Sequence, residues 1–149
     1  MIEPLRLSFE VDCPVERAFE VWTGRIGRWW PADHTATGEP DLEIVLETRV
    51  GGRIFERTRD GIEHDWGELT AWDPPARLAY RWHLRRDRAD ATDVEIRFRR
   101  TSPGTTRVEI EHTGWERLGA GGPEWRDRNR QGWDTLLPHY QAAISEEER

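Results

Sequence analysis

The sequence predicts one α+β domain, in which a curved antiparallel sheet of seven strands wraps around a long C-terminal helix. Three observations favour this fold class. Apolar and polar residues alternate in seven separate segments, short turn sequences divide those segments, and helical spacing occurs only near the two ends of the chain. The 149 residues suit a single domain, spanning 1–149, with a substantial core. Strands joined by short turns pair antiparallel, and the final helix has to cover their apolar face.

The N-terminal part predicts one strand followed by two short helices. Apolar residues occupy the odd positions from Leu5 to Val11, which is typical of a half-buried strand. Asp12 or Cys13 is expected to cap a first helix that runs from about Pro14 to Trp22. A second short helix is expected over 26–30, before the next proline.

Six more strands are expected between the second short helix and the C-terminal helix. The alternation of apolar residues places them within 42–46, 53–59, 62–72, 78–84, 94–98 and 108–112. Asp60-Gly61 is a strong hairpin signal, and Asp73-Pro74-Pro75 predicts a turn. On the strand at 62–72 the two faces conflict, and a bulge near Gly67 would reconcile them. Residues 86–91 are expected to form a polar turn.

The C-terminal region predicts a glycine-rich loop over 114–122 and then a helix from about Pro123 to Ser145. One stripe of this helix is mostly apolar. Pro138 inside the helix predicts a kink near Asp134. The stripe consists of Trp125, Asn129, Trp133, Leu136, Leu137, Tyr140 and Ile144.

Composition excludes several classes of function. The net charge of −7 argues against nucleic-acid binding, and no apolar run approaches the ~20 residues that span a membrane. The single cysteine, Cys13, precludes an internal disulfide and favours a cytoplasmic location. The five histidines form no metal-binding pair at ligand spacing, and nucleotide-binding motifs are absent. We therefore expect no metal and no cofactor.

Several segments together resemble a known superfamily. The run from Gly67 to Trp82, GELTAWDPPARLAYRW, resembles the central signature of the SRPBCC (START-like) superfamily, and more narrowly the branch named for the C-terminal domain of the activator of heat-shock protein 90 ATPase. Further matching segments are Pro14–Phe19, Gly51-Gly52-Arg53, Gly104–Val108, His112–Trp115 and Gly132-Trp133. The resemblance implies a helix-grip fold with a cavity between the sheet and the last helix.

Nine tryptophans suggest that the cavity, if present, has aromatic walls. The resemblance and the strand parity together suggest non-catalytic binding of a small hydrophobic or aromatic molecule. An inward aromatic side chain is more often core filler than ligand wall, so the cavity is expected to be either open or filled by its own indoles. The predicted ligand-binding residues are Trp29, Trp30, Phe55, Trp66, Tyr80, Trp82, Phe98, His112, Trp115, Trp133, Leu137 and Tyr140.

Two alternative functions stay open. A protein-interaction module is the first, by analogy with the chaperone activator, and the partner could also be a second copy of the chain. A cyclase-type or hydrolase-type enzyme is the second, and it needs an acid or base in the cavity, for which Glu56, His64 and His112 are the candidates. His112 stands where an apolar residue is expected, so it is predicted either to orient a ligand or to hydrogen-bond the backbone at the strand end.

Overall fold

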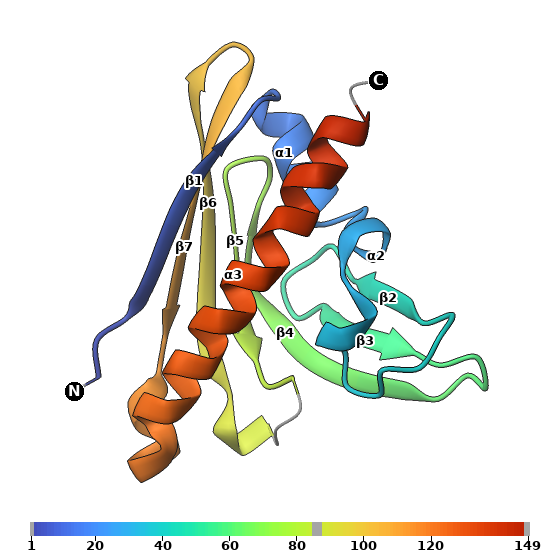
Figure 1. The fold of residues 1–149 in the computed structure, drawn as a ribbon, viewed down its shortest axis with the longest axis vertical. Helices are drawn as coiled ribbons and strands as arrows, with labels where there is room; N and C mark the ends of the chain where they lie inside the picture. Colours follow the sequence, from blue (N-terminus) through green and yellow to red (C-terminus); the bar gives the residue numbers. More distant parts are fainter. Residues whose placement is uncertain (1, 85–87, 148–149) are drawn as a thin grey trace.

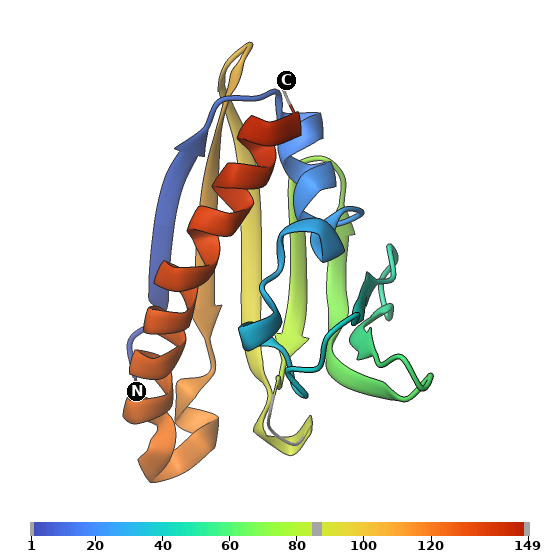
Figure 2. The same ribbon diagram turned by 45° about the vertical axis from the view of Figure 1, so that its right-hand side comes forward.

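The computed structural model describes residues 2–84 and 88–147 and confirms the predicted fold class (Figure 1). Seven strands form one antiparallel sheet in the order β1-β7-β6-β5-β4-β3-β2. The long helix α3 crosses one face of this sheet, and α1 and α2 lie on the same side (Figure 2). The strands are β1 Leu5–Val11, β2 Glu43–Leu46, β3 Arg53–Arg57, β4 Glu63–Asp73, β5 Arg77–Trp82, β6 Thr92–Ser102 and β7 Thr105–Thr113. The helices are α1 Val15–Trp22, α2 Ile26–Trp29 and α3 Gly122–Glu147, with 3₁₀ turns η1 Ala32–His34, η2 Arg88–Asp90 and η3 Trp115–Gly121.

The element order follows the prediction, and several boundaries differ from it. Pro14 itself takes the N-cap position of α1, where Asp12 or Cys13 was expected, because its extended backbone precedes the first helical residue. The loop expected over 114–122 is instead the 3₁₀ turn η3, whose first residue, Trp115, is fully buried. The helix α3 continues without a break through Pro138. Of the polar turn expected over 86–91, residues 86 and 87 lie outside the described part of the chain.

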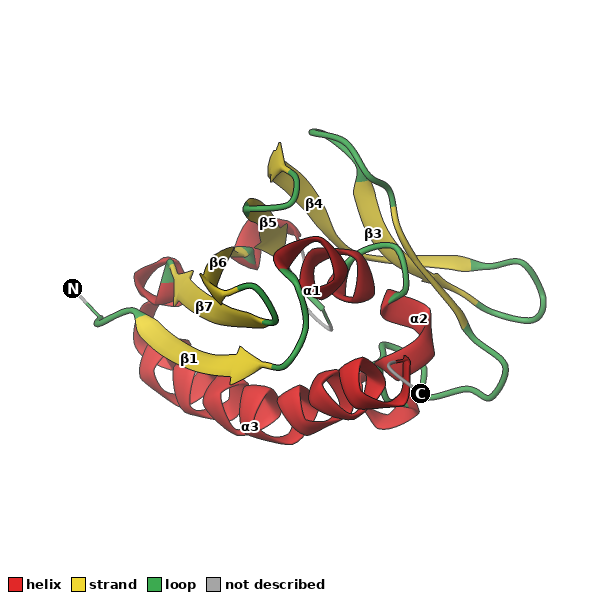
Figure 3. Ribbon diagram, turned by 90° about the horizontal axis from the view of Figure 1, so that it is seen from above, coloured by secondary structure: helices red, strands yellow, loops and turns green. Residues whose placement is uncertain are grey.

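Two irregularities on β4 bend the sheet. Ile54 pairs with Gly67 and Phe55 with Asp65, so Trp66 is an extra residue that bulges from the ladder. A second shift leaves Thr70 unpaired against β5. Bulges increase local twist and bend a strand, and β4, β3 and β2 accordingly curve around the helices (Figure 3). The first bulge is the one predicted near Gly67, where any side chain would clash with the backbone oxygen of Arg81.

The two faces of the sheet differ in polarity, as the alternation predicts. The face toward α3 is apolar and buried, with Leu78, Ile96 and Val108 completely enclosed. The opposite face carries ion pairs such as Arg97 with Glu95 and Arg99 with Glu109. Exposed ion pairs contribute little stability each, so burial of the apolar face dominates the folding energy. None of the described helices is long and apolar enough to cross a membrane.

Candidate functional site

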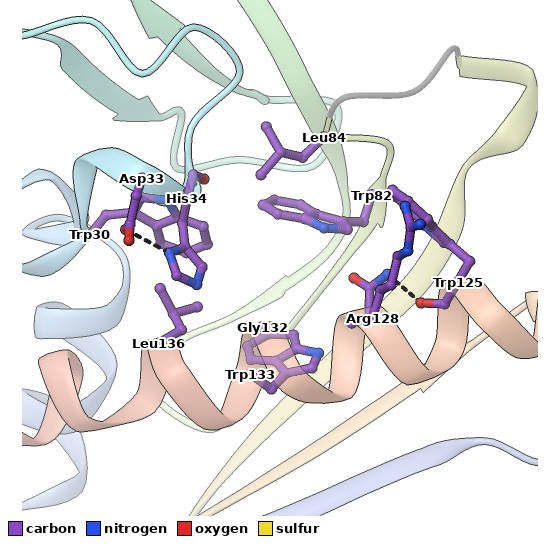
Figure 4. Close-up of a pocket in the computed structure, with 11 residues that line it drawn as sticks. Trp30, Asp33, His34, Trp82, Leu84, Trp125, Arg128, Gly132, Trp133 and Leu136 are labelled. Atoms are coloured by element: carbon purple, nitrogen blue, oxygen red, sulfur yellow. Dashed lines mark hydrogen bonds and ion pairs between the residues drawn. The ribbon is translucent and has the colours of Figure 1, made fainter.

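A pocket of about 280 Å³ opens at one end of the space between the sheet and α3 (Figure 4). It lies where η1, the end of β5 and the N-terminal half of α3 meet. Its volume is close to the lower limit of about 300 Å³ that is typical of small-molecule sites. The lining residues are Trp30, Asp33, His34, Trp82, Leu84, Trp125, Arg128, Asn129, Gly132, Trp133 and Leu136.

Indole rings form much of the pocket wall. Trp82 extends from β5 and Trp133 from α3, and Figure 4 shows them on opposite sides of the space. Trp30 packs against Trp82 at a ring-centroid separation of 5.8 Å. Leu84 and Leu136 contribute further apolar surface. A wall of this composition favours a flat apolar molecule, because aromatic faces stack on one another and displace water.

Polar groups lie at two ends of the pocket. Asp33 and His34 of η1 are at one end, and Arg128 stands beside Trp125 at the other (Figure 4). The guanidinium of Arg128 also pairs with Glu124 at 3.1 Å and lies 5.8 Å from the Trp125 ring centroid. The amide of Asn129 donates to the backbone oxygen of Trp125. Few convergent polar groups in an apolar wall are the usual composition of a ligand site.

The middle of the space between sheet and helix is filled, and we call it the sealed centre. It consists of side chains that are at most 4% exposed, chiefly Trp22, Trp29, Phe98, Trp115 and Tyr140, together with His112. Trp22 contacts the rings of Trp29, Phe98, Trp133 and Tyr140 at centroid separations from 4.9 to 6.5 Å. The indoles therefore fill the predicted cavity at its middle and leave a pocket at one end.

His112 is fully buried in the sealed centre, and both ring nitrogens have side-chain partners. Nδ1 accepts a hydrogen bond from the indole of Trp133 at 3.2 Å, so Nε2 carries the proton and donates to the hydroxyl of Thr92 at 2.6 Å. Burial lowers the pKa of His112 to about 3, which keeps the ring neutral. The ring of His112 therefore bonds side chains and not the backbone at the strand end, contrary to that expectation, and it fixes the wall residue Trp133.

Glu56 is a second buried polar group, and it anchors the segment that follows η1. Its carboxylate accepts hydrogen bonds from the backbone of Ala36 and Thr37, from the Thr37 hydroxyl and from the indole of Trp66. Burial by itself raises the pKa of Glu56, but these donors together hold it below its ordinary value. The carboxylate is therefore a fixed anion that ties the chain after η1 to β3 and β4.

The predicted ligand-binding residues divide into three groups. Trp30, Trp82 and Trp133 line the pocket. Phe55 lies on the other face of the sheet, under the guanidinium of Arg53 at 4.1 Å, because it alternates along β3 with the inward Ile54 and Glu56. The remaining predicted residues are buried packing: Trp29, Trp66, Tyr80, Phe98, His112, Trp115, Leu137 and Tyr140.

Several lining residues were not predicted as ligand contacts. Trp125, Asn129 and Leu136 had been assigned to the inward stripe of α3, and Leu84 to a strand. Asp33 and His34 gave no usable signal, because η1 has no periodicity and its position depends on packing. Arg128 and Gly132 face the pocket only because α3 extends beyond the sealed centre there.

The three acid or base candidates for an enzyme lie outside the pocket wall. Glu56 and His112 are engaged in buried hydrogen bonds, and His64 is on β4, away from the lining residues. Within the described residues 2–84 and 88–147, no group of three or more His, Cys, Asp or Glu side chains could hold a metal ion.

Comparison with known proteins gives a family and a set of similar folds. The family model described as activator of Hsp90 ATPase homolog 1-like protein matches residues 12–143. A solved structure described as an anthrahydroquino-γ-pyrone synthase, Txn09, complexed with SUM is 37% identical, with 83% of this chain and 84% of that chain covered and a TM-score of 0.59. No curated protein matches.

Two further solved structures cover nearly the whole chain. The self-sacrificing resistance protein CalC from Micromonospora echinospora is 29% identical over 97% of this chain and 95% of its own, with a TM-score of 0.73. PFC0360w, an HSP90 activator from Plasmodium falciparum, is 19% identical over 95% and 96%, with a TM-score of 0.69. The latter likeness supports the fold alone.

Proposed function

The chain belongs to the activator of Hsp90 ATPase homolog 1-like family, and from this premise we propose that it binds a small, flat hydrophobic or aromatic molecule in the pocket between η1, β5 and α3. The observation that carries the proposal is the pairing of Trp82 and Trp133 across the pocket. Their rings belong to rigid elements, and Trp133 is fixed by His112. A preformed aromatic slot costs little reorganisation when a ring enters it.

The comparisons support a small molecule as the partner more than a protein. Txn09, which is 37% identical, is described by its name as a synthase of an anthrahydroquino-γ-pyrone, a fused aromatic compound. The HSP90 activator is only 19% identical. For this chain, a planar polycyclic compound that fits between two indoles is accordingly the ligand class that we propose.

Gly132 offers a direct test of the pocket. It lies in α3 on the pocket wall, and a Cβ built there meets no atom within 4 Å. The substitution Gly132→Leu should therefore fill the pocket without straining the helix. We expect at least tenfold weaker binding of a planar probe such as naphthalene or anthraquinone, measured by quenching of tryptophan fluorescence.

Two control variants separate pocket filling from other effects. Gly132→Ala adds one methyl group and should retain binding, while it stabilises the helix by about 0.5–1 kcal/mol. Gln131→Leu adds the same side chain at the neighbouring, exposed position of α3, outside the pocket. If Gly132→Leu binds the probe as tightly as Gln131→Leu does, or if wild-type protein binds none of the probes, the proposal is wrong.

A further inference from the structure

A histidine–carboxylate pair stands at the rim of the pocket. His34 Nδ1 lies 2.9 Å from Asp33 Oδ1. The His34 side chain is 20% exposed and lines the pocket, whereas that of Asp33 is 81% exposed. The pair thus spans the boundary between solvent and the apolar wall.

The segment that carries the pair is held in place from both sides. On one side, the indole nitrogen of the buried Trp30 donates to the backbone oxygen of His34 at 2.9 Å. On the other side, the buried carboxylate of Glu56 accepts from Ala36 and Thr37. Thr35, between them, bonds back to the oxygen of Ala32 at 2.7 Å. His34 is therefore positioned by buried groups, although it lies in a three-residue 3₁₀ turn.

The contact with Asp33 fixes the role of each ring nitrogen. The hydrogen bond with His34 lowers the pKa of the Asp33 carboxyl, so Asp33 is ionised at neutral pH and only accepts. Nδ1 of His34 must then be the donor. In the neutral ring, the other nitrogen, Nε2, carries a lone pair and accepts a hydrogen bond. A neighbouring carboxylate also makes this nitrogen a better acceptor.

The rest of the pocket limits what can reach this acceptor. Trp82 and Trp133 lie on opposite sides of the space, and His34 and Arg128 lie at different ends of it (Figure 4). A ring held between the indoles has its edge, and therefore its substituents, directed toward these ends. At the His34 end, a substituent that donates a hydrogen bond is favoured.

We infer that His34, oriented by Asp33, accepts a hydrogen bond from an acidic hydroxyl group on the ligand, so that the pocket selects hydroxylated aromatic compounds over their ethers. The inference rests on the proposed function and adds the substituent that the site recognises. His34 is a specificity-determining residue in this assignment, and Asp33 is the residue that positions it.

The test compares 2-naphthol with 2-methoxynaphthalene, which has the same ring system but no donor. Binding is measured by tryptophan quenching at about pH 8, where a free imidazole is neutral. One net hydrogen bond predicts a preference for 2-naphthol of about three- to tenfold in wild-type protein. In His34→Leu this preference should fall to less than about twofold, while 2-methoxynaphthalene keeps its affinity. His64→Leu, on β4 and outside the residues that line the pocket, should keep the preference.

Asp33→Ala is the variant for the positioning role. Without the carboxylate the ring no longer has a fixed tautomer, so we expect a partial loss of the preference and an unchanged affinity for the ether. His34→Gln retains an acceptor in its amide oxygen and should restore part of the preference that His34→Leu removes. This rescue is not expected if His34 serves only to hold η1 in place.

The outcomes separate the two proposals. Equal binding of both probes by wild-type protein would overturn the role of His34 and leave the proposed function standing. A preference that persists in His34→Leu would do the same. If His34→Leu weakens both probes equally, the residue only supports the pocket wall and the assignment is wrong. If neither probe binds to wild-type protein, both proposals are wrong.

Discussion

The sealed centre and the pocket lie in the same space between the sheet and α3 and are built from the same kind of residue, yet one is closed and the other open. In the sealed centre the rings pack against rings from other elements, and Trp22 meets rings of α2, β6 and α3. At the pocket, α3 presents Gly132, and η1 presents short polar residues. The difference shows that local side-chain volume, rather than hydrophobicity, decides where this fold leaves room.

The same comparison holds for the two histidines. His112 in the sealed centre has both ring nitrogens satisfied by Thr92 and Trp133. His34 at the pocket has one nitrogen bound to Asp33 and remains partly exposed. A buried ring with two fixed partners serves packing, whereas a partly exposed ring with one fixed partner can recognise a ligand. Three predictions test this contrast.

The largest expected effect is on stability in the sealed centre. Trp22 is 1% exposed, so Trp22→Ala leaves a cavity that its neighbours cannot fill. We expect a loss of about 3–5 kcal/mol in the free energy of unfolding, measured by urea denaturation. Trp125→Ala, on the half-buried wall of the pocket, should cost clearly less. Similar losses in the two variants would contradict the contrast between a closed and an open region.

The second prediction concerns Glu56, which anchors the rim of the pocket. Glu56→Gln replaces a carboxylate that accepts from several donors, and hydrogen bonds to charged groups contribute about 1.5–3 kcal/mol. Because the pKa of Glu56 is lowered in the folded state, its contribution is present above the ordinary value of 4.5 and is lost as the pH falls through the folded value.

The measurement is the unfolding free energy between pH 7 and pH 3. Wild-type protein should lose stability below about pH 4.5. Glu56→Gln should be less stable at pH 7, but its free energy of unfolding should fall less steeply as the pH is lowered. Glu39→Gln, at an exposed position, serves as the control. If the free energy of unfolding falls as steeply at acid pH in Glu56→Gln as in wild-type protein, the carboxylate is not a fixed anion.

The third prediction follows from the neutral ring of His112. Its pKa is about 3 in the folded protein and ordinarily 6.5, so the unfolded chain takes up a proton that the folded protein does not. The stabilisation is therefore complete above pH 6.5 and is lost as the pH falls toward 3, at up to about 1.4 kcal/mol per pH unit.

Urea midpoints between pH 6.5 and pH 5 isolate this effect, because carboxyl groups titrate mainly below that range. His112→Gln should be less stable at pH 7 and should lack most of the slope. His139→Gln, at an exposed site, should keep it. If His112→Gln retains the wild-type slope, another group must control the acid sensitivity.

Much of the fold was predictable because its signals are local. The alternation from Leu5 to Val11, the Asp60-Gly61 turn and the conflict of faces around Gly67 each depend on a few neighbouring residues, and the structure places a strand, a hairpin and a bulge there. The predicted N-cap of α1 and the predicted loop at η3 were wrong. Neither the backbone of Pro14 nor the burial of Trp115 follows from sequence periodicity.

The candidate site was predictable only in part. Parity correctly placed Trp82 on the inner face of β5 and Trp133 on the inner side of α3, and both line the pocket. The alternation of residues along a strand could not show which inward rings pack against other rings and which face open space. Tyr80 and Phe98, predicted on the same grounds, are buried and lie outside the residues that line the pocket.

The α+β class, the order of the elements and the apolar face of the sheet follow from periodicities of two and 3.6 residues, and the amino-acid pattern alone is enough to predict them. Packing in three dimensions was needed to show that the indoles close the middle of the cavity, that Phe55 lies on the other face of the sheet, and that Asp33 and His34 meet the pocket. These outcomes depend on the bulges of β4 and on where α3 lies against the sheet. The first bulge has a local signal in the conflict of faces around Gly67, but the position of α3 depends on contacts between distant segments, which no local pattern encodes.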